Sequence, residues 1–246
     1  MILWLSLLFF SGISIGEFFA LWRKEDSLLV RLAWAFGLGA SGTVLAFFLR
    51  NFLSLTVSET VTAITITSAT LLGISIIGRR RFVFPVRFER RDLPLLLLLL
   101  VQSLIIYSHF LKFPVFPQTR SVDFESHVRI VETYSGGRMP DLDDQILYYG
   151  VHYLLSSLLL LEPGEPLIAV RQGMGVLAAL SPLAVYLASH RLFESRTPTL
   201  VASVLFVSGF VWFGMVFNTG LYPNFYSALA SLWLVAIAVQ FMKDRG

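Results

Sequence analysis

The most constraining feature of the sequence is a series of apolar runs, each close to the length that crosses a lipid bilayer. An α-helix rises about 1.5 Å per residue, so about 20 apolar residues span a hydrocarbon core about 30 Å thick. A mean hydropathy of +0.73 agrees with such segments. We therefore expect an all-α polytopic membrane protein with about seven transmembrane helices. The seven runs lie at about residues 1–21, 32–49, 60–78, 93–111, 168–189, 198–217 and 222–242.

An eighth apolar run, residues 145–161, is a little short, and it decides the topology. Short cytoplasmic loops are enriched in lysine and arginine. If residues 145–161 do not cross, all four basic clusters fall on one side of the membrane. These clusters are Arg23-Lys24 with Arg31, Arg79 to Arg81 with Arg87, Arg90 and Arg91, Arg191 with Arg196, and Lys243 with Arg245. We therefore place the amino terminus and the acidic loop outside the membrane and the carboxyl terminus in the cytoplasm.

Residues 145–161 also carry a polar stripe. On a helix Gln145, Tyr149, His152 and Ser156 share one face, surrounded by Leu, Val and Tyr. Such a stripe suits a helix that lies at the interface or enters the bilayer re-entrantly. The alternative is a short spanning helix whose polar seam faces its neighbours.

Three segments follow from this topology. Residues 1–112 form an amino-terminal four-helix membrane segment, 113–166 an extracytoplasmic acidic loop with one or two interfacial helices, and 167–246 a three-helix membrane segment.

The first apolar run lacks a basic start and a small-residue cleavage site, so we expect it to be a retained helix and not a signal peptide. The net charge of +3 does not indicate a nucleic-acid partner, because the arginines lie in short loops beside apolar runs.

The acidic loop concentrates the residues that can do chemistry. Eight of the sixteen carboxylates and two of the four histidines lie between Lys112 and Pro166. If residues 123–134 form a helix, Asp123 and His127 lie one turn apart on the same face. A carboxylate there can act as general base toward a hydroxyl or bind a divalent cation, and the histidine can orient it or contact a phosphate. Asp123 also suits a helix N-cap, which is compatible with either role, and His127 also suits a polar contact within the loop.

Other residues near this loop are candidates for substrate binding. Glu125 shares a face with Arg129 and Glu132, which is also typical of a solvated, self-paired surface. His152 can contact a lipid phosphate or a sugar, or it can be a satisfied polar contact. Arg171 can pair with a loop carboxylate or an anionic lipid phosphate, although snorkelling to the interface also explains it.

A second candidate site is the segment Asn218-Thr-Gly-Leu-Tyr-Pro-Asn224. In the predicted topology it lies outside, between two spans, and faces the acidic loop. Asn218, Tyr222 and Asn224 offer neutral groups that can bind a sugar or a cation. The alternative is an ordinary helix hairpin that uses the usual turn residues.

The order of these motifs resembles the amino-terminal half of GT-C superfamily membrane glycosyltransferases, which include oligosaccharyltransferases and protein O-mannosyltransferases. The resemblance is greatest to prokaryotic members, archaeal ones among them, with an Asp-x-x-x-His loop. It departs from the pattern where Tyr148-Tyr149 replace the paired prolines that precede the family's glycine. The residues that carry it are Asp123-Phe-Glu-Ser-His127, the turn from Gly136 to Pro140, Tyr148-Tyr-Gly-Val-His152, Arg171, Pro182-Leu-Ala-Val-Tyr186 and His190-Arg-Leu-Phe193.

This resemblance implies a function and a site. The donor would be a polyprenyl-phosphate-linked sugar and the acceptor a hydroxyl on the extracytoplasmic side, with Asp123 beside the acceptor or a divalent cation, Mg²⁺ or Mn²⁺, and His127 as its companion. Family members continue through more helices, so we expect the chain to be incomplete relative to a full enzyme. The alternative expectation is a non-catalytic membrane subunit or lipid-binding scaffold with a GT-C-derived fold, working with a second membrane subunit.

Overall fold

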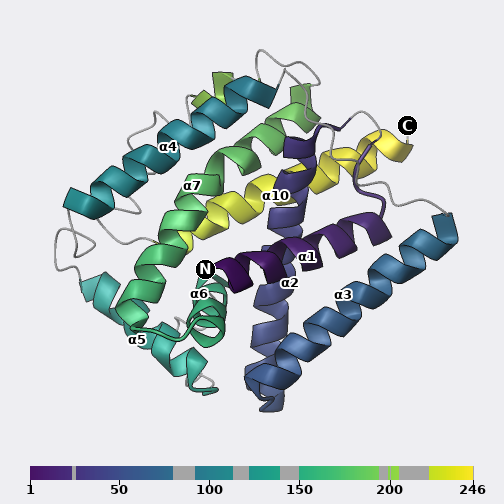
Figure 1. Ribbon diagram of the computed structural model, residues 1–246. Helices are drawn as coiled ribbons and strands as arrows, with labels where there is room; N and C mark the ends of the chain where they lie inside the picture. The colour runs from purple at the N-terminus through teal and green to yellow at the C-terminus, as the bar shows by residue number, and fades with distance from the viewer. Residues whose placement is uncertain are drawn as a thin grey trace. The chain divides into compact units, whose positions relative to one another are not determined.

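The computed structural model describes residues 1–23, 26–79, 92–112, 122–138, 150–193, 199, 201–204 and 222–245. Within these residues the structure is helical and contains no strand, which confirms the all-α class (Figure 1). The main helices are α1 (Ile2–Phe18), α2 (Leu28–Leu53), α3 (Val57–Arg79), α4 (Leu93–Lys112), α5 (Val122–Ser135), α6 (Gly150–Leu161), α7 (Pro166–Phe193) and α10 (Tyr222–Arg245).

Four of the described helices are long and apolar enough to cross a membrane, so the chain is an integral membrane protein. They correspond to four of the runs predicted to span. Their limits are Leu28–Leu53, Val57–Gly78, Pro166–Phe193 and Phe225–Lys243.

The other predicted spans are shorter here or lie outside the described residues. The apolar parts of α1 and α4 are Ile2–Phe18 and Leu93–Ser108, and most of the run 198–217 is not described. Helix α6 has 12 residues, and at about 1.5 Å per residue it covers less than the hydrocarbon core. Residues 145–149 are not described, so the seven spans and the non-crossing course of 145–161 stay predictions.

Helix α1 ends before the predicted limit of its run for a local reason. Ala20 has a positive φ of 55°, and the Leu21 N–H bonds back to the Gly16 carbonyl at 3.0 Å. This left-handed residue with a long backward hydrogen bond is a common helix stop. The apolar character of the run continues to Leu21, but the helix does not.

The described residues divide into two compact units. The first consists of Met1–Lys24, Trp34–Pro85 and Glu125–Gly173, and the second of Glu25–Ala33, Val86–Phe124 and Met174–Gly246.

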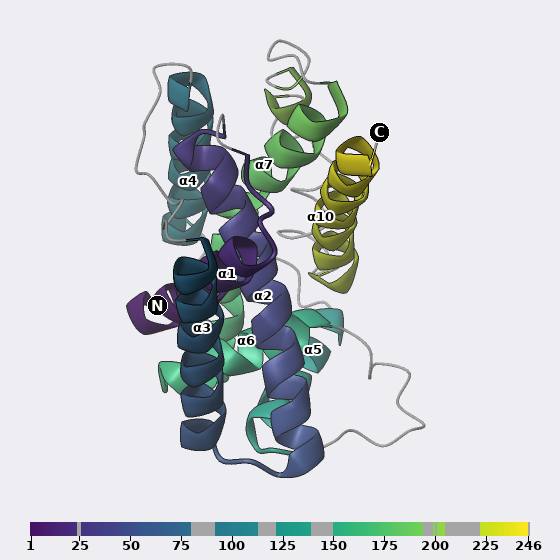
Figure 2. The same ribbon diagram turned by 90° about the vertical axis from the view of Figure 1, so that its right-hand side faces the viewer.

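In the first unit, α1 crosses α2 (Figure 2), and glycines lie where the two helices meet. A Cβ on Gly12 would lie 1.7 Å from the Ala35 carbonyl oxygen, and one on Gly39 would lie 1.9 Å from the Leu8 carbonyl oxygen. Any side chain at either position would therefore collide with the backbone of the other helix. Small residues at such crossings are how membrane helices reach close contact.

The turn from α2 into α3 is closed by a capping box. The Glu59 carboxylate accepts from the Thr56 N–H at 2.7 Å, and Thr56 Oγ1 accepts from the Glu59 N–H at 3.2 Å. These reciprocal bonds satisfy backbone donors that the first turn of a helix leaves without partners. They explain why α3 begins immediately after Thr56.

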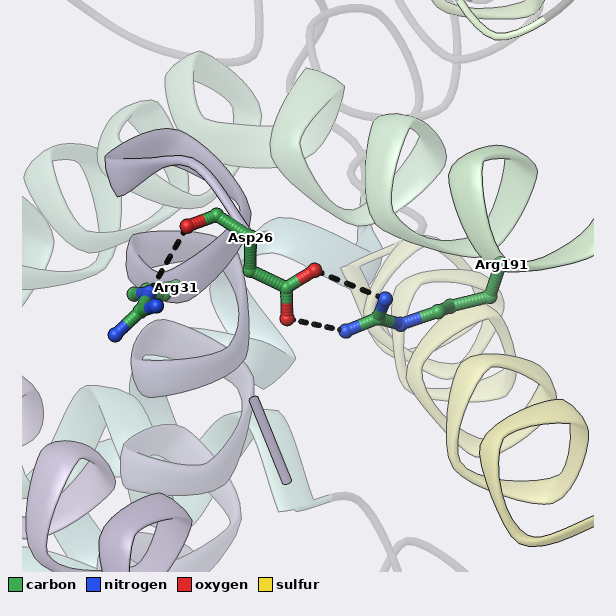
Figure 3. Close-up of polar contacts among 3 residues, drawn as sticks. All are labelled: Asp26, Arg31 and Arg191. Carbon is green, nitrogen blue, oxygen red and sulfur yellow. Dashed lines mark hydrogen bonds and ion pairs between the residues drawn. The ribbon is translucent and has the colours of Figure 1, made fainter. Parts of the chain in front are cut away.

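The second unit is held together at one end by a buried ion pair. Asp26, just before α2, accepts from Arg191 Nη1 and Nη2 at 3.0 and 2.6 Å, and its backbone carbonyl accepts from Arg31 Nε at 3.0 Å (Figure 3). Both side chains of the pair are nearly inaccessible, with exposures of 0% for Asp26 and 3% for Arg191. Lys243 of α10 donates to the Arg191 carbonyl at 2.7 Å. Asp26 and its contacts therefore join the start of α2 to the ends of α7 and α10.

We expect Asp26→Leu to lower the free energy of unfolding by about 3–5 kcal/mol, because it leaves the buried Arg191 guanidinium without its counter-charge. The double variant Asp26→Leu/Arg191→Met should recover much of this loss, since both charges are then removed. Thermal unfolding in detergent, followed by tryptophan fluorescence, measures both effects. Glu132→Gln, at an exposed position, is the control, and a double variant no more stable than the single one would contradict the prediction.

Candidate functional site

The predicted loop helix is present as α5, Val122–Ser135. Glu125, Arg129 and Glu132 are exposed on one face, as the sequence predicts for them. His127, Val131 and Tyr134 are buried. Helix α5 therefore presents a charged face outward and packs the side that carries His127 against the rest of the first unit.

His127 meets His152 of α6 in the interior of this unit. Nδ1 of His127 lies 2.9 Å from Nε2 of His152, and the ring centroids are 5.0 Å apart. The exposed fractions of the two residues are 8% and 0%. Since a hydrogen bond between two ring nitrogens needs one donor and one acceptor, a neutral pair holds a single proton between them. The structure thus brings together two residues that the sequence predicted for the site separately.

Helix α5 is anchored by the end of α2, a contact that the sequence analysis did not identify. Arg50 Nη1 and the Asn51 side-chain amide each donate to the Tyr134 carbonyl at 3.1 Å, and Arg50 Nη2 donates to the Ser135 carbonyl at 3.2 Å. These carbonyls belong to the last turn of α5, where a cation also complements the helix dipole. The sequence does contain an indication that Arg50 has a structural role. This residue follows the run 32–49 on the side predicted to be outside, where basic residues are uncommon.

The glycine turn after α5 completes this anchor. Gly137 has a φ of +76°, its N–H bonds to the Tyr134 carbonyl at 3.1 Å, and the Arg138 N–H bonds to the Thr133 carbonyl at 3.3 Å. This pair of bonds is a Schellman motif, which favours glycine at the left-handed position. The Gly-Gly turn noted in the sequence therefore has a structural role, because it ends α5 where Arg50 reaches its carbonyls.

Aromatic and hydroxyl groups fix His152 on α6. The Tyr134 ring stands edge-on to His152, with centroids 6.2 Å apart, and stacks on Tyr153 at 4.3 Å. Ser156 Oγ lies 2.7 Å from the His152 carbonyl and 3.1 Å from the Val131 carbonyl of α5. The polar seam of α6 thus faces a neighbouring helix, as in the alternative interpretation of residues 145–161.

Helix α6 is also tied to the start of α1. Trp4 Nε1 donates to Ser157 Oγ at 2.9 Å, and the Glu162 carboxylate accepts from the Leu3 N–H at 2.9 Å and pairs with the Met1 ammonium. The hydrogen bond from this ammonium is the main reason that the pKa of Glu162 lies below its ordinary value. These contacts hold α6, and with it His152, against the start of α1 within the first unit.

The remaining predicted site residues are placed only in part. Asp123 lies at the second position of α5, one turn before His127, and its side chain is not described, so its predicted roles stay predictions. Arg171 is partly buried in the second turn of α7. Tyr222 and Asn224 lie in the first turn of α10 with side chains that are not described, and Asn218 lies outside the described residues. A shared site between the acidic loop and Asn218 to Asn224 stays a prediction.

The described side chains do not bring together enough ligands for a metal ion. No group of three or more His, Asp or Glu residues is close enough there to hold a metal ion. The Asp123 carboxylate is not among these side chains. The register of α5 is compatible with Asp123 and His127 binding a divalent cation together, and that site stays a prediction.

We expect Arg50→Met to loosen α5, because it removes charged donors to two carbonyls of the last turn, each such bond contributing about 1.5–3 kcal/mol. Amide hydrogen exchange in the last turn of α5 should then accelerate by about 10- to 100-fold. Arg129→Met, on the exposed face of the same helix, is the matched control. Equal exchange in the two variants would show that Arg50 does not anchor α5.

Comparison of the chain with protein-family models, with curated proteins and with solved structures finds no match. The candidate site therefore rests on its geometry and on the resemblance in the sequence.

Proposed function

We propose that the chain is a membrane glycosyltransferase, or the amino-terminal module of one, that transfers a sugar from a polyprenyl-phosphate carrier to an acceptor hydroxyl. The observation that carries this proposal is the contact between His127 and His152. These histidines belong to two separate motifs of the GT-C resemblance, the Asp-x-x-x-His loop and the aromatic-Gly-x-His helix. Their contact is what a common active site for both motifs requires.

The chemistry assigned to this site is a displacement at the anomeric carbon. The acceptor oxygen forms a bond to that carbon, the bond from the carbon to the phosphate oxygen breaks, and the electron pair leaves with the polyprenyl phosphate. A base must take the proton of the acceptor hydroxyl. Asp123 and His127, one turn apart on α5, are the groups we assign to that proton, as general base and companion.

Positive charge helps the phosphate to leave. Arg171 is the source that we propose, or a divalent cation, Mg²⁺ or Mn²⁺, which Asp123 would hold as a metal ligand in place of its role as general base. Glu125 and the segment from Asn218 to Asn224 complete the proposed binding site for the sugar and the acceptor.

The proposal includes a topology with seven spans and with α5 on the extracytoplasmic side. Support comes from the polar cluster around Asp26, where Arg31, Arg191 and Lys243 meet at one end of the second unit. These three cations come from three of the basic clusters assigned to the cytoplasm. Their grouping at one end is what the positive-inside pattern requires.

We expect Asp123→Asn to lower the rate of transfer by about 100-fold or more, because an amide cannot accept the acceptor's proton. The assay uses the purified chain in nanodiscs with radiolabelled polyprenyl-phosphate mannose or glucose and a panel of hydroxyl-bearing peptides and glycans. Glu132→Gln, exposed on the same helix, should keep full activity. An Asp123→Asn variant as active as the unaltered chain would remove Asp123 from this role.

A second candidate function, a non-catalytic lipid-binding scaffold or subunit, is favoured by an apolar cavity of about 420 Å³ in the first unit. Helices α1, α2 and α3 line it, and α2 and α3 are long enough to span a membrane. Its walls are mostly aliphatic, which suits one hydrocarbon chain. The lining residues are Ser11, Ile15, Gly42, Leu45, Ala46, Leu49, Leu53, Leu55, Thr60, Ala63, Ile64, Thr67, Ser68 and Leu71.

We expect Ala63→Trp to reduce the amount of lipid that co-purifies with the chain, because the indole fills part of this cavity. Native mass spectrometry after purification in a mild detergent measures the bound lipid. Thr65→Trp, in the same helix but outside the lining, is the control. Retained lipid with no transfer activity, together with stable co-purification of a second membrane protein, would favour the scaffold over the enzyme.

A further inference from the structure

A proline inside α7 deprives one backbone carbonyl of its ordinary partner. In an α-helix the N–H of each residue bonds to the carbonyl four residues before it. Pro182 has no N–H, so the Ala178 carbonyl receives no such bond. Both residues are buried near the middle of α7. A carbonyl in an apolar interior needs another donor, because water does not reach it.

Two side chains donate to this carbonyl. Ser181 Oγ, on the same helix, lies 2.7 Å from the Ala178 carbonyl oxygen. Gln102 Nε2, on α4, donates to the same carbonyl and also to Ser181 Oγ, at 3.1 Å. Gln102 has no exposed surface, so its bonds are shielded from water. Since a carbonyl oxygen has two lone pairs, the two side chains use both of them.

The Gln102 bonds lie on a narrow contact stripe of α4. Among the described side chains of α4, only Leu95, Gln102 and Ile106 are buried. Their spacing places them on one face of the helix. Large apolar side chains elsewhere on α4 are exposed, for example Leu97 at 53% and Leu104 at 56%. Helix α4 therefore rests on the second unit through one stripe, and Gln102 is the polar member of that stripe.

The polar member decides the position of α4, because the rest of the stripe is apolar. Lipid chains are as apolar as leucine, so apolar side chains gain little when they leave lipid for a neighbouring helix. Interhelical hydrogen bonds in a membrane, by contrast, shift a packing equilibrium by about 3- to 20-fold. An effect of this size holds a helix in place and is small enough to be reversed.

We propose that Gln102 is a latch that holds α4 against α7 at the carbonyl freed by Pro182, and that α4 leaves this seated position when the amide withdraws. Ser181 permits the opening, since its hydroxyl keeps the Ala178 carbonyl bonded. Opening therefore loses the Gln102 bonds without also leaving a buried carbonyl unpaired. This conformational device goes beyond the proposed glycosyl transfer and does not depend on it.

Distances between spin labels test the latch, and the absence of cysteine from the chain makes site-specific labelling simple. Leu104→Cys on α4 and Leu192→Cys on α7 replace exposed residues. In nanodiscs, double electron–electron resonance should give one narrow distance distribution for this pair. Gln102→Met keeps the length of the side chain but removes the amide. We expect it to add a displaced population and to lower the ratio of seated to displaced α4 by about 3- to 20-fold.

Two controls distinguish the latch from disturbed packing. Ser103→Met, at the exposed position next to Gln102, should leave the distribution narrow. A reference pair, Leu192→Cys with Leu234→Cys on α10, should keep its distance in every variant. A distribution unchanged in Gln102→Met, or broadened equally in Ser103→Met, would overturn the latch. A reference pair that changes together with the first pair would also overturn it, because the second unit as a whole would then be loosened.

Pro182→Ala tests the role of the proline. This variant should fold, since alanine favours a helix interior far more than proline does. It restores an N–H, so three donors compete for the two lone pairs of the Ala178 carbonyl and the Gln102 bond weakens. We therefore expect Gln102→Met to change the ratio of seated to displaced α4 less in the Pro182→Ala background than in the unaltered chain. Equal changes in the two backgrounds would overturn the link between the amide and the proline.

Discussion

The constraint on which most of the structure depends is the high free energy of a polar group that lacks a partner in an apolar interior. The two buried histidines, the end of α5 and the ion pair at Asp26 each supply partners for buried polar groups in a different way. The imidazoles bond to each other, the α5 carbonyls accept from Arg50 and Asn51, and Asp26 binds Arg191 through both oxygens. Each of these solutions joins elements far apart in the sequence, so the need for partners also fixes how the helices pack.

The sequence predicted the elements better than their contacts. Long apolar runs gave four helices of membrane-spanning length, and the spacing of charged and apolar residues gave α5 with its exposed Glu125, Arg129 and Glu132. Hydrophobicity did not reveal where α1 ends, because the stop depends on a left-handed Ala20 and not on polarity. The contact of His127 with His152 also escaped prediction, since periodicity describes one helix at a time and these residues lie on two.

Local turn chemistry links the end of α2 to the candidate site. Arg50 and Asn51 lie in the last turn of α2, and Ser54, with a φ of 54°, ends that helix before the capping box of α3 begins. Arg50 and Asn51 donate from this last turn of α2 to the Tyr134 carbonyl. Tyr134 contacts His152, so the end of α2 contributes to holding the histidine pair.

The cations that orient a membrane protein are usually regarded as solvated, yet here several are structural. Arg31 and Arg191 are buried around Asp26, and Lys243 donates to a backbone carbonyl. A positive-inside signal needs these charges only on the correct side of the membrane. Their burial adds a stricter requirement, because a guanidinium in this place must have Asp26 or a carbonyl as its acceptor. The charges on which the predicted topology rests thus also join the start of α2 to the ends of α7 and α10 within the second unit.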